Sequence, residues 1–480
     1  MHVKGFSAMF QIIDSFLSEF RHCFSRRSAF VWFSILVIGF IIRFDHLGAS
    51  SFIRWLFINP DLYDPMLHFF RATSWTLSEL LARWIKVVAS RYPIIEINGR
   101  VVQIGDTIKI GKEASKMPAV KTLHQESEDN SKPEYIQGHH FGFITILVGF
   151  AAKLFCVPVQ ARIIEGTEGL RDTAESEPDT PSIYESLVTR MALMAVDTAR
   201  QMGKLSYVVM DAYFATGPCF KVFGAAVDEK GRALAHLITR AKNHYVAFMN
   251  RGPKPYIEKN KIRLTDLFDF PQIFETAQVT IQGELRTIRF YCVDLLWEPV
   301  KGLLRFVCVF DGEGRYVLMS SDLELDPTQI ITIYIYRSKI EVMFFALKHL
   351  LGGFCYHFWT KAFPRLKRGQ SLDVTKLGKA AKLKMDRVIE AVERFVNLAA
   401  ITLGLLQYLS LYHADKIWNE YKGWLRTTSS SHPSEGVVQN VLQAQFFSFL
   451  GQAEAGKVPA SRTLQFIIGK GRSERKLHPG

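Results

Sequence analysis

Cysteine is scarce in this chain of 480 residues, which contains six of them. None stands in a C-x-x-C pair, so the sequence offers neither the spacing of a zinc site nor the framework of a disulfide-stapled domain. Most lie among aromatic residues or valine, as buried thiols do. Thiols of this kind favour a reducing compartment, and we predict a cytoplasmic protein.

Long hydrophobic runs are lacking too. Residues 29–42 (AFVWFSILVIGFII) form an uncharged run of 14 residues, which is shorter than the ~20 that a spanning helix needs. No small-residue cleavage site of a signal peptide follows it. We therefore predict a buried core helix here and no contact with a membrane.

Three further signals are missing. No glycine fingerprint of a phosphate loop or a dinucleotide site stands between a predicted strand and a predicted helix. No serine or cysteine stands in a nucleophile elbow, and no internal repeat is visible. If the chain is an enzyme, its chemistry needs neither a covalent protein nucleophile nor these loops.

What the chain does have is a large excess of positive charge. Lys and Arg number 59 against 46 Asp and Glu, which gives a net charge of +13. Such a balance suits a polyanionic partner such as nucleic acid, although charge alone also fits a membrane surface. The composition, 48% hydrophobic and 22% charged, is globular, and the length allows two or three domains.

The order of predicted elements divides the chain into three parts. Residues 1–92 read as short arginine-bearing helices, and the stretch 47–56 (LGASSFIRWL) has the shape of a helix-turn-helix, so we predict a DNA-binding domain. Residues 93–365 carry a catalytic domain with a β-rich insertion at about 245–328. Residues 366–480 add one or two long helices and a basic tail. A helical bundle that merely packs on the rest is the alternative for residues 1–92.

The middle domain reads as three strands, a helix, a strand, a helix and a strand, with a later helix near residue 341. An Asn98-Gly99 hairpin opens it, and residues 111–140 read as a long polar loop. This order is typical of an α/β, ribonuclease-H-like core, in which acidic residues at strand ends and on a late helix converge.

One stretch, residues 332–359 (TIYIYRSKIEVMFFALKHLLGGFCYHFW), combines apolar residues with a polar stripe. On a continuous helix Tyr334, Arg337, Glu341 and Lys348 would share one face, because their spacings are three, four and seven residues. An ordinary Arg337–Glu341 helical ion pair on a solvated surface explains the pattern equally simply.

The same spacing, Tyr-x2-Arg-x3-Glu-x6-Lys, resembles the signature around the last catalytic carboxylate of DDE transposases of the insertion-sequence-4 family. The resemblance extends to Gly105-Asp106-Thr107, which is similar to the family's first-strand motif. It also extends to Asp211, which basic residues at Arg240 and Lys242 follow. It covers roughly residues 95–360 and implies that Asp106, Asp211 and Glu341 are the catalytic acids.

Three carboxylates are oxygen ligands suited to Mg²⁺ or Mn²⁺. Two such ions ~4 Å apart would support in-line phosphoryl displacement. The resemblance thus implies a transposase that hydrolyses the phosphodiester at the 3′ ends of a bacterial element and transfers the strand to target DNA. Its partners would be the terminal inverted repeats and target DNA, bound by a homodimer in the bacterial nucleoid.

Candidate DNA contacts surround the acids. By the resemblance, Tyr334, Arg337 and Lys348 would hold terminal phosphates, and Arg240 and Lys242 would do likewise. Trp297, in the insertion, is a candidate for stacking on an extruded base. A tryptophan of the core is the alternative.

Other interpretations stay open at this stage. Asp106 can be a turn residue and Asp211 a helix N-cap, while Asp294 and Asp322 are rival acids near strand ends. The protein can also be a ribonuclease-H-like nuclease without strand transfer, or a catalytically decayed DNA-binding protein.

Overall fold

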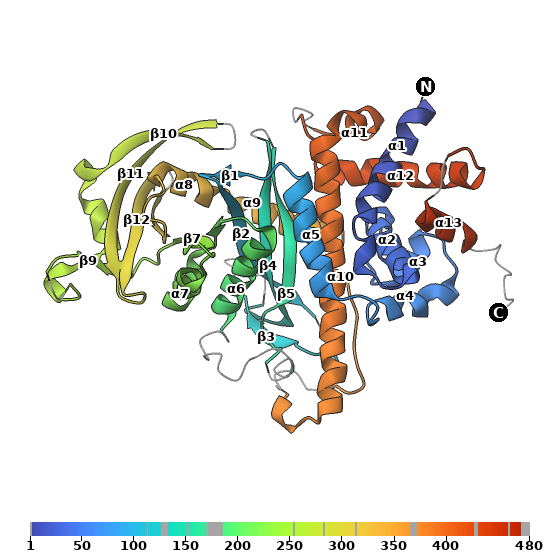
Figure 1. Cartoon of the computed structure of the whole chain (residues 1–480), viewed down its shortest axis with the longest axis horizontal. Helices are drawn as coiled ribbons and strands as arrows, with labels where there is room; N and C mark the ends of the chain where they lie inside the picture. The colour runs from blue at the N-terminus through green and yellow to red at the C-terminus, as the bar shows by residue number, and fades with distance from the viewer. Residues whose placement is uncertain are drawn as a thin grey trace.

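A computed structural model provides the structure of the chain (Figure 1). It describes residues 2–112, 114–125, 133–150, 153–168, 170, 186–252, 255–281, 284–312, 314–364, 372–426, 431–458 and 461–471. Within these residues the protein is a mixed α/β fold built on one sheet of 13 strands.

The N-terminal region is helical, as predicted. Its helices are α1 (His2–Ser18), α2 (Arg27–Ile42), α3 (Ser50–Trp55), α4 (Tyr63–Phe69) and α5 (Leu77–Arg91). Thr76 caps α5 by accepting a hydrogen bond from the backbone N–H of Glu79, which is a common helix start. The apolar run at 29–42 falls within α2, where most side chains are buried, so the prediction of a core helix is confirmed.

The central part of the sheet opens with the predicted hairpin. Asn98 and Gly99 both have positive φ angles, 49° and 71°, as a two-residue turn of this kind requires. The strands that follow are β1 (Glu96–Ile97), β2 (Arg100–Gly111), β3 (Lys121–His124), β4 (Tyr135–Phe150), β5 (Lys153–Ile163), β6 (Ser206–Val209) and β7 (Ala235–Arg240). Helices α6 (Leu187–Met202) and α7 (Gly217–Ala225) precede and follow β6.

The strands of this part run in a defined order, β5-β4-β2-β6-β7. β4 is antiparallel to both β5 and β2, whereas β2, β6 and β7 are parallel to one another. The predicted long loop at 111–140 is wrong in part, because β3 and the first residues of β4 (Tyr135–His140) lie in it, and β3 pairs with β4 there.

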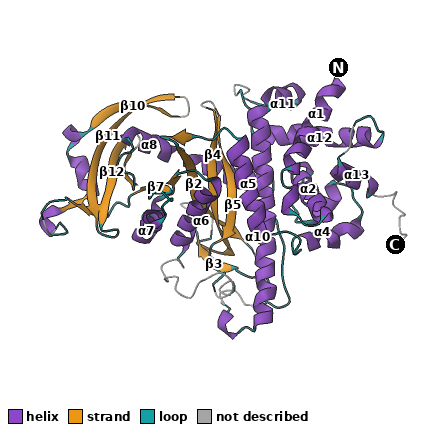
Figure 2. Ribbon diagram, in the orientation of Figure 1, coloured by secondary structure: helices purple, strands orange, loops and turns teal. Residues whose placement is uncertain are grey.

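The β insertion continues the sheet. It contains β8 (Val246–Phe248), β9 (Lys261–Arg263), β10 (Glu275–Ile281), β11 (Glu284–Trp297), β12 (Gly302–Asp311) and β13 (Gly314–Ser320). β13 pairs with the end of β7, so the insertion extends the central sheet on the side away from β5. Figures 1 and 2 show these strands curving away from the centre of the molecule.

The single helix on which Tyr334, Arg337, Glu341 and Lys348 were expected to share one face is not continuous. The chain forms α8 (Pro327–Ile335), α9 (Ser338–Phe345) and a π-helical turn at Ala346–Leu350, and it is not helical from 351 to 359. Arg337 therefore lies at the junction between two helices. The last helices are α10 (Lys379–Tyr412), α11 (Ala414–Glu420), α12 (Glu435–Glu454) and α13 (Arg462–Gly469).

Helices from the two ends of the chain pack together. α2 contacts α10, α12 and α13, while α10 also packs on β5 (Figure 1). The buried side chains of both regions belong to one hydrophobic cluster. The helices of residues 1–92 and of residues 366–480, which we predicted as separate domains, thus share one core.

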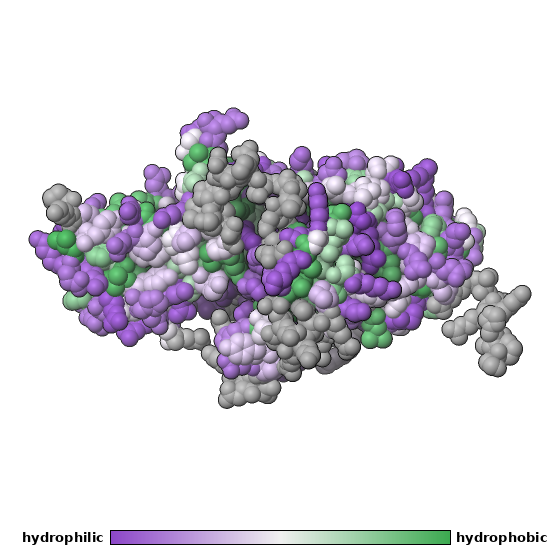
Figure 3. Space-filling model, turned by 90° about the horizontal axis from the view of Figure 1, so that it is seen from below, coloured by the Kyte–Doolittle hydropathy of each residue, from purple (hydrophilic) through white to green (hydrophobic). Residues whose placement is uncertain are grey.

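One helix among the described residues, α10, is long and apolar enough to cross a membrane, but 89% of its most apolar stretch is buried inside the protein. A core helix of a soluble protein has the same character. On the face drawn in Figure 3, apolar residues form separate patches among hydrophilic ones.

Asn397 fixes α10 to the edge strand β5. Its side-chain amide accepts a hydrogen bond from the N–H of Ala161 at 3.0 Å and donates one to the C=O of the same residue at 2.8 Å. One turn earlier, the buried carboxylate of Glu393 accepts from the N–H of Ile163 at 2.9 Å. These contacts satisfy peptide groups that the helix shields from water.

We expect Asn397→Leu to destabilise the fold by about 3 kcal/mol, because it leaves a buried N–H and a buried C=O without partners. Urea unfolding followed by circular dichroism measures this change. Lys384→Leu, at an exposed position of the same helix, is the control. A loss below about 1 kcal/mol in Asn397→Leu would show that water replaces the amide at no cost.

Candidate active site

Asp106 lies within β2, and Asp211 lies at the matching position just beyond the end of the neighbouring parallel strand β6. Ile104 of β2 pairs with Val209 of β6, and the two acids are each two residues further along (104 + 2 and 209 + 2). Because parallel strands run in the same direction, Asp106, in the middle of β2, and Asp211, just beyond the end of β6, lie at the same level across the sheet. The two aspartates are 105 residues apart in sequence (211 − 106), which is also the offset between paired residues of β2 and β6.

The carboxylate of each aspartate accepts a hydrogen bond from the backbone N–H of a residue that follows it in the chain. Asp106 is buried, and its Oδ1 accepts a hydrogen bond from the N–H of Thr107 at 2.7 Å. Asp211 caps a short 3-10 turn, accepting from the N–H of Tyr213 at 3.0 Å. The interpretation of Asp211 as an N-cap is thus correct. A carboxylate that caps a turn through one oxygen can also bind a metal ion through the other.

Arg337 lies between Glu341 and Asp106 and contacts both carboxylates. Arg337 donates from Nη1 to Oδ2 of Asp106 at 3.0 Å and lies 3.9 Å from Oε1 of Glu341. The helical ion pair with Glu341 is thus the longer of the two contacts. Glu341 itself is exposed, with 63% of its side chain accessible, on a helix that packs on β2 and β5.

The pKa of Asp106 reflects both its burial and the other two acids, whose negative charges disfavour its ionised form. Burial, followed by the negative charge of Asp211, raises the pKa of Asp106 to about 7. The Thr107 N–H and the Arg337 guanidinium lower this pKa, and Glu341 raises it further. Burial disfavours the charge of Arg337, but the nearby negative groups outweigh it and raise the pKa of Arg337 above its usual value.

Two other predicted residues lie near this cluster. Tyr334 is half-buried, and burial raises its pKa, while the charges of Arg337 and Arg240 lower it. Arg240 in turn lies over the ring of Tyr316 at 5.6 Å. Arg337 thus contacts Asp106, Tyr334 lies beside Arg337, and Arg240 lies beside Tyr334 and Tyr316. Helix α8 ends between Tyr334 and Arg337.

A basic pocket of about 450 Å³ adjoins this cluster. Its lining includes the predicted Arg240 and Lys242 and three bases that the sequence analysis missed, His244, Arg263 and Arg315. Arg263 ends β9 and Arg315 lies near the start of β13. The 3-10 segment at Leu264–Asp269, which follows Arg263 directly, contacts β13, so it brings together two residues that are 52 positions apart in sequence (315 − 263). No short-range signal could have found them.

The other two predicted DNA-binding residues, Lys348 and Trp297, do not lie in the acid cluster. Lys348 is exposed on the π-helical turn after α9. Trp297 is 4% exposed and packs against Phe220 and Tyr245, with ring centroids at 5.6 and 5.5 Å. Those contacts are what a core tryptophan makes, and stacking on a base would require the indole to leave them.

The rival acids have structural partners. Asp294 pairs with Arg305 at 2.9 Å. Asp322 accepts a hydrogen bond from the hydroxyl of Tyr207 at 2.8 Å. Neither contributes to the pKa shift of Asp106.

The arrangement of donors bears on metal binding. No group of three or more His, Cys, Asp or Glu side chains in the described part of the chain is gathered closely enough to hold an ion. Arg337 is the cation that balances the acids in this conformation. The donor set is nevertheless oxygen-only and anionic, as Mg²⁺ or Mn²⁺ requires, so its chemistry fits such an ion if Arg337 turns aside.

Comparison with known proteins gives no assignment: no family model matches the chain, and no curated protein is significantly similar to it.

Proposed function

We propose that the chain is a DNA transposase of the insertion-sequence-4 type. It would hydrolyse the phosphodiester at the ends of its element and then use the released 3′-OH to attack target DNA. The observation that carries the proposal is the register of the parallel strands β2 and β6, which sets Asp106 and Asp211 at the same level, with Arg337 between Asp106 and Glu341.

The sheet supports this proposal at the level of fold. The order β5-β4-β2-β6-β7, with three antiparallel strands followed by two parallel ones, is the order that a ribonuclease-H-like core requires. The insertion β8–β13 stands between the second and third acids, where the resemblance implies it.

Asp106, Asp211 and Glu341 are the residues that would hold Mg²⁺ or Mn²⁺. When bound, divalent ions of this kind activate the attacking water and stabilise the leaving oxygen of the phosphate. The chain's own contribution is to place Asp106 within β2, Asp211 just beyond β6 and Glu341 on α9, which packs on β2 and β5. Binding an ion would require Arg337 to leave Asp106 and the three carboxylates to move closer together.

Basic residues would hold the DNA backbone beside the acids. Arg337 can release Asp106 and donate two hydrogen bonds to a phosphate, and the basic pocket at Arg240 and Lys242 can hold a neighbouring phosphate. Lys348 would add a flexible charge at the exposed rim. Since two element ends are brought together, we propose that a homodimer binds them in the bacterial nucleoid.

Arg337→Ala is expected to lower the slope of log affinity against log salt for duplex DNA by about one unit, because one phosphate contact is lost. Arg337→Lys is expected to rescue binding in part, since an ammonium lacks the bidentate fork. Filter binding at several salt concentrations measures the slope. Lys339→Ala, two residues along, is the control.

An unchanged slope in Arg337→Ala, together with wild-type cleavage, would mean that Arg337 merely balances the acids.

Two alternatives make different predictions. A nuclease would cleave in the presence of Mg²⁺ or Mn²⁺ but would not join a 3′-OH to a plasmid target. The Arg337–Asp106 ion pair favours the second alternative, a decayed protein that binds DNA without cleaving it. Cleavage assays with and without divalent ions, followed by strand-transfer assays, separate the three.

A further inference from the structure

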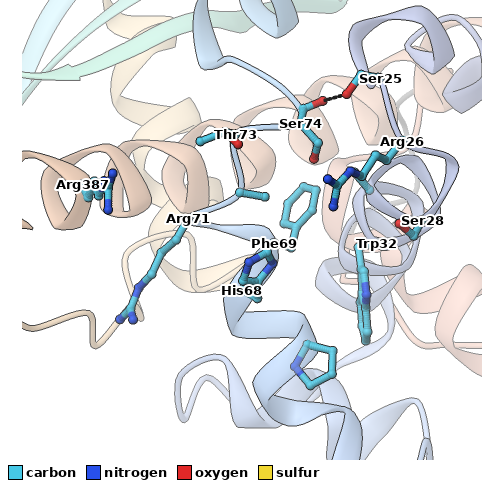
Figure 4. Close-up of a pocket in the computed structure, with 13 residues that line it drawn as sticks. Ser25, Arg26, Ser28, Trp32, His68, Phe69, Arg71, Thr73, Ser74 and Arg387 are labelled. Atoms are coloured by element: carbon cyan, nitrogen blue, oxygen red, sulfur yellow. Dashed lines mark hydrogen bonds between the residues drawn. The ribbon is translucent and has the colours of Figure 1, made fainter.

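A second basic pocket lies in the helical part of the molecule, apart from the acid cluster. It has a volume of about 830 Å³ and is lined by the residues before and at the start of α2, by α4 and the turn after it, and by α10 (Figure 4). A volume of this size is typical of small-ligand sites, which span ~300–1,000 Å³.

The charge of this pocket has one sign. Arg26, Arg71, Arg387 and His68 line it, with Arg26 on one side and Arg71 and Arg387 on the other (Figure 4), and no Asp or Glu is among its described lining residues. All four side chains are exposed to solvent. Hydroxyl groups of Ser25, Ser28, Thr73 and Ser74 add neutral hydrogen-bonding capacity to the wall.

The backbone around the pocket strengthens the positive field. Helix α2 begins at this wall, its N-cap residue Arg26 makes no side-chain cap, and its first turn contains no acidic residue. The partial positive charge of a 16-residue helix is thus directed at the pocket without a protein carboxylate to balance it.

Several carbonyl oxygens in the turn after α4 already accept hydrogen bonds from other parts of the protein. Arg394 of α10 donates to the C=O of Phe70, Ala72 and Trp75 at 3.2, 2.8 and 3.0 Å. Ser25 donates from Oγ to the C=O of Ser74 at 3.0 Å (Figure 4). Of these acceptors, the carbonyl groups of Ala72 and Ser74 belong to residues that line the pocket, and both are already hydrogen-bonded within the protein.

We propose that this pocket is an anion site that binds a ligand carrying at least two phosphate groups. Three guanidinium groups match several phosphate oxygens, because each can donate bidentately. The phosphates can belong to a small polyphosphate or to the backbone of a DNA duplex. This inference does not depend on the proposed transposase activity, since it involves none of the catalytic acids.

Titration calorimetry of the full-length chain with inorganic pyrophosphate tests the site. Saturable binding is expected in the wild type, and at least about tenfold weaker binding in Arg26→Gln/Arg71→Gln/Arg387→Gln. The control is Arg200→Gln/Lys221→Gln/Lys230→Gln, which removes the same number of charges from exposed positions elsewhere. Asp106→Asn should bind pyrophosphate as the wild type does, even if it cleaves no DNA.

Displacement of a labelled duplex by pyrophosphate distinguishes the sources of phosphate. Displacement, with a lower salt slope in the triple variant than in its control, assigns the pocket to DNA. Binding without displacement assigns it to a small polyphosphate. Absence of saturable binding in the wild type, or equal binding in both triple variants, overturns the proposal. If the triple variant does not fold, Arg26→Gln alone, judged by its melting curve, serves in its place.

Discussion

Replacing Asp106 or Asp211 by Asn, or Glu341 by Gln, is expected to reduce DNA cleavage at least about 1,000-fold, because members of one catalytic unit fail together. Binding to DNA should persist in all three variants. Each amide is nearly isosteric with its acid, so the local structure should survive. An amide oxygen at position 106 can still accept from the N–H of Thr107, and one at position 211 can still cap its turn. The amide at position 341 replaces an exposed side chain.

The matched controls are Asp294→Asn and Asp322→Asn, which change acids that contact Arg305 and Tyr207. Their cleavage rates should stay within a few-fold of the wild type. Cleavage of a labelled element end, measured with Mg²⁺ and with Mn²⁺, gives the rates. If a variant at 106, 211 or 341 retains more than a few per cent of the wild-type rate, its residue is not a member of the catalytic set.

Local patterns were sufficient to predict most elements of the fold. The Asn98-Gly99 turn, the apolar run of α2 and the strand that ends just before Asp211 are all short-range signals, since turn geometry and burial act within a few residues. The strand end predicted at Asp106 is wrong, because β2 continues to Gly111. The spacing around Glu341 selected Arg337 and Tyr334, which lie near Asp106, but also Lys348, which does not, and the helix it assumed is broken.

What the sequence could not provide is the set of long-range contacts. The helix break at Arg337 turns its guanidinium to Asp106, 231 residues earlier (337 − 106). The insertion joins the central sheet through β13, and the terminal helices share a core. Such contacts depend on how whole elements pack, and tertiary packing overrides the periodicity of a single helix.

The raised pKa of Asp106 has a consequence for stability that activity assays do not measure. In the folded protein this pKa is about 7, against 3.8 for the unperturbed side chain. Between these values the folded state holds a proton that the unfolded state has released, so the contribution of Asp106 falls as pH rises from about 4 to about 7. Above that window the folded protein carries the full cost of a buried charge.

Asp106→Asn is therefore expected to raise the free energy of unfolding at pH 8, by at most about 4 kcal/mol at ~1.4 kcal/mol per pKa unit, and to match the wild type at pH 4. Thermal melts across this range measure the difference. Asp322→Asn is the opposite control, because hydrogen bonds lower the pKa of Asp322 despite its burial, and its loss should destabilise at pH 8.

Divalent ions supply the second arm of this test. If Asp106, Asp211 and Glu341 hold Mg²⁺ or Mn²⁺, either ion should raise the melting temperature of the wild type at pH 8, since a ligand that binds the folded state stabilises it. The increase should be much smaller in Asp106→Asn, which has lost one anionic ligand. Parallel pH profiles for the wild type and Asp106→Asn would show instead that Arg337 already neutralises Asp106 fully, and that the acids do not need another cation.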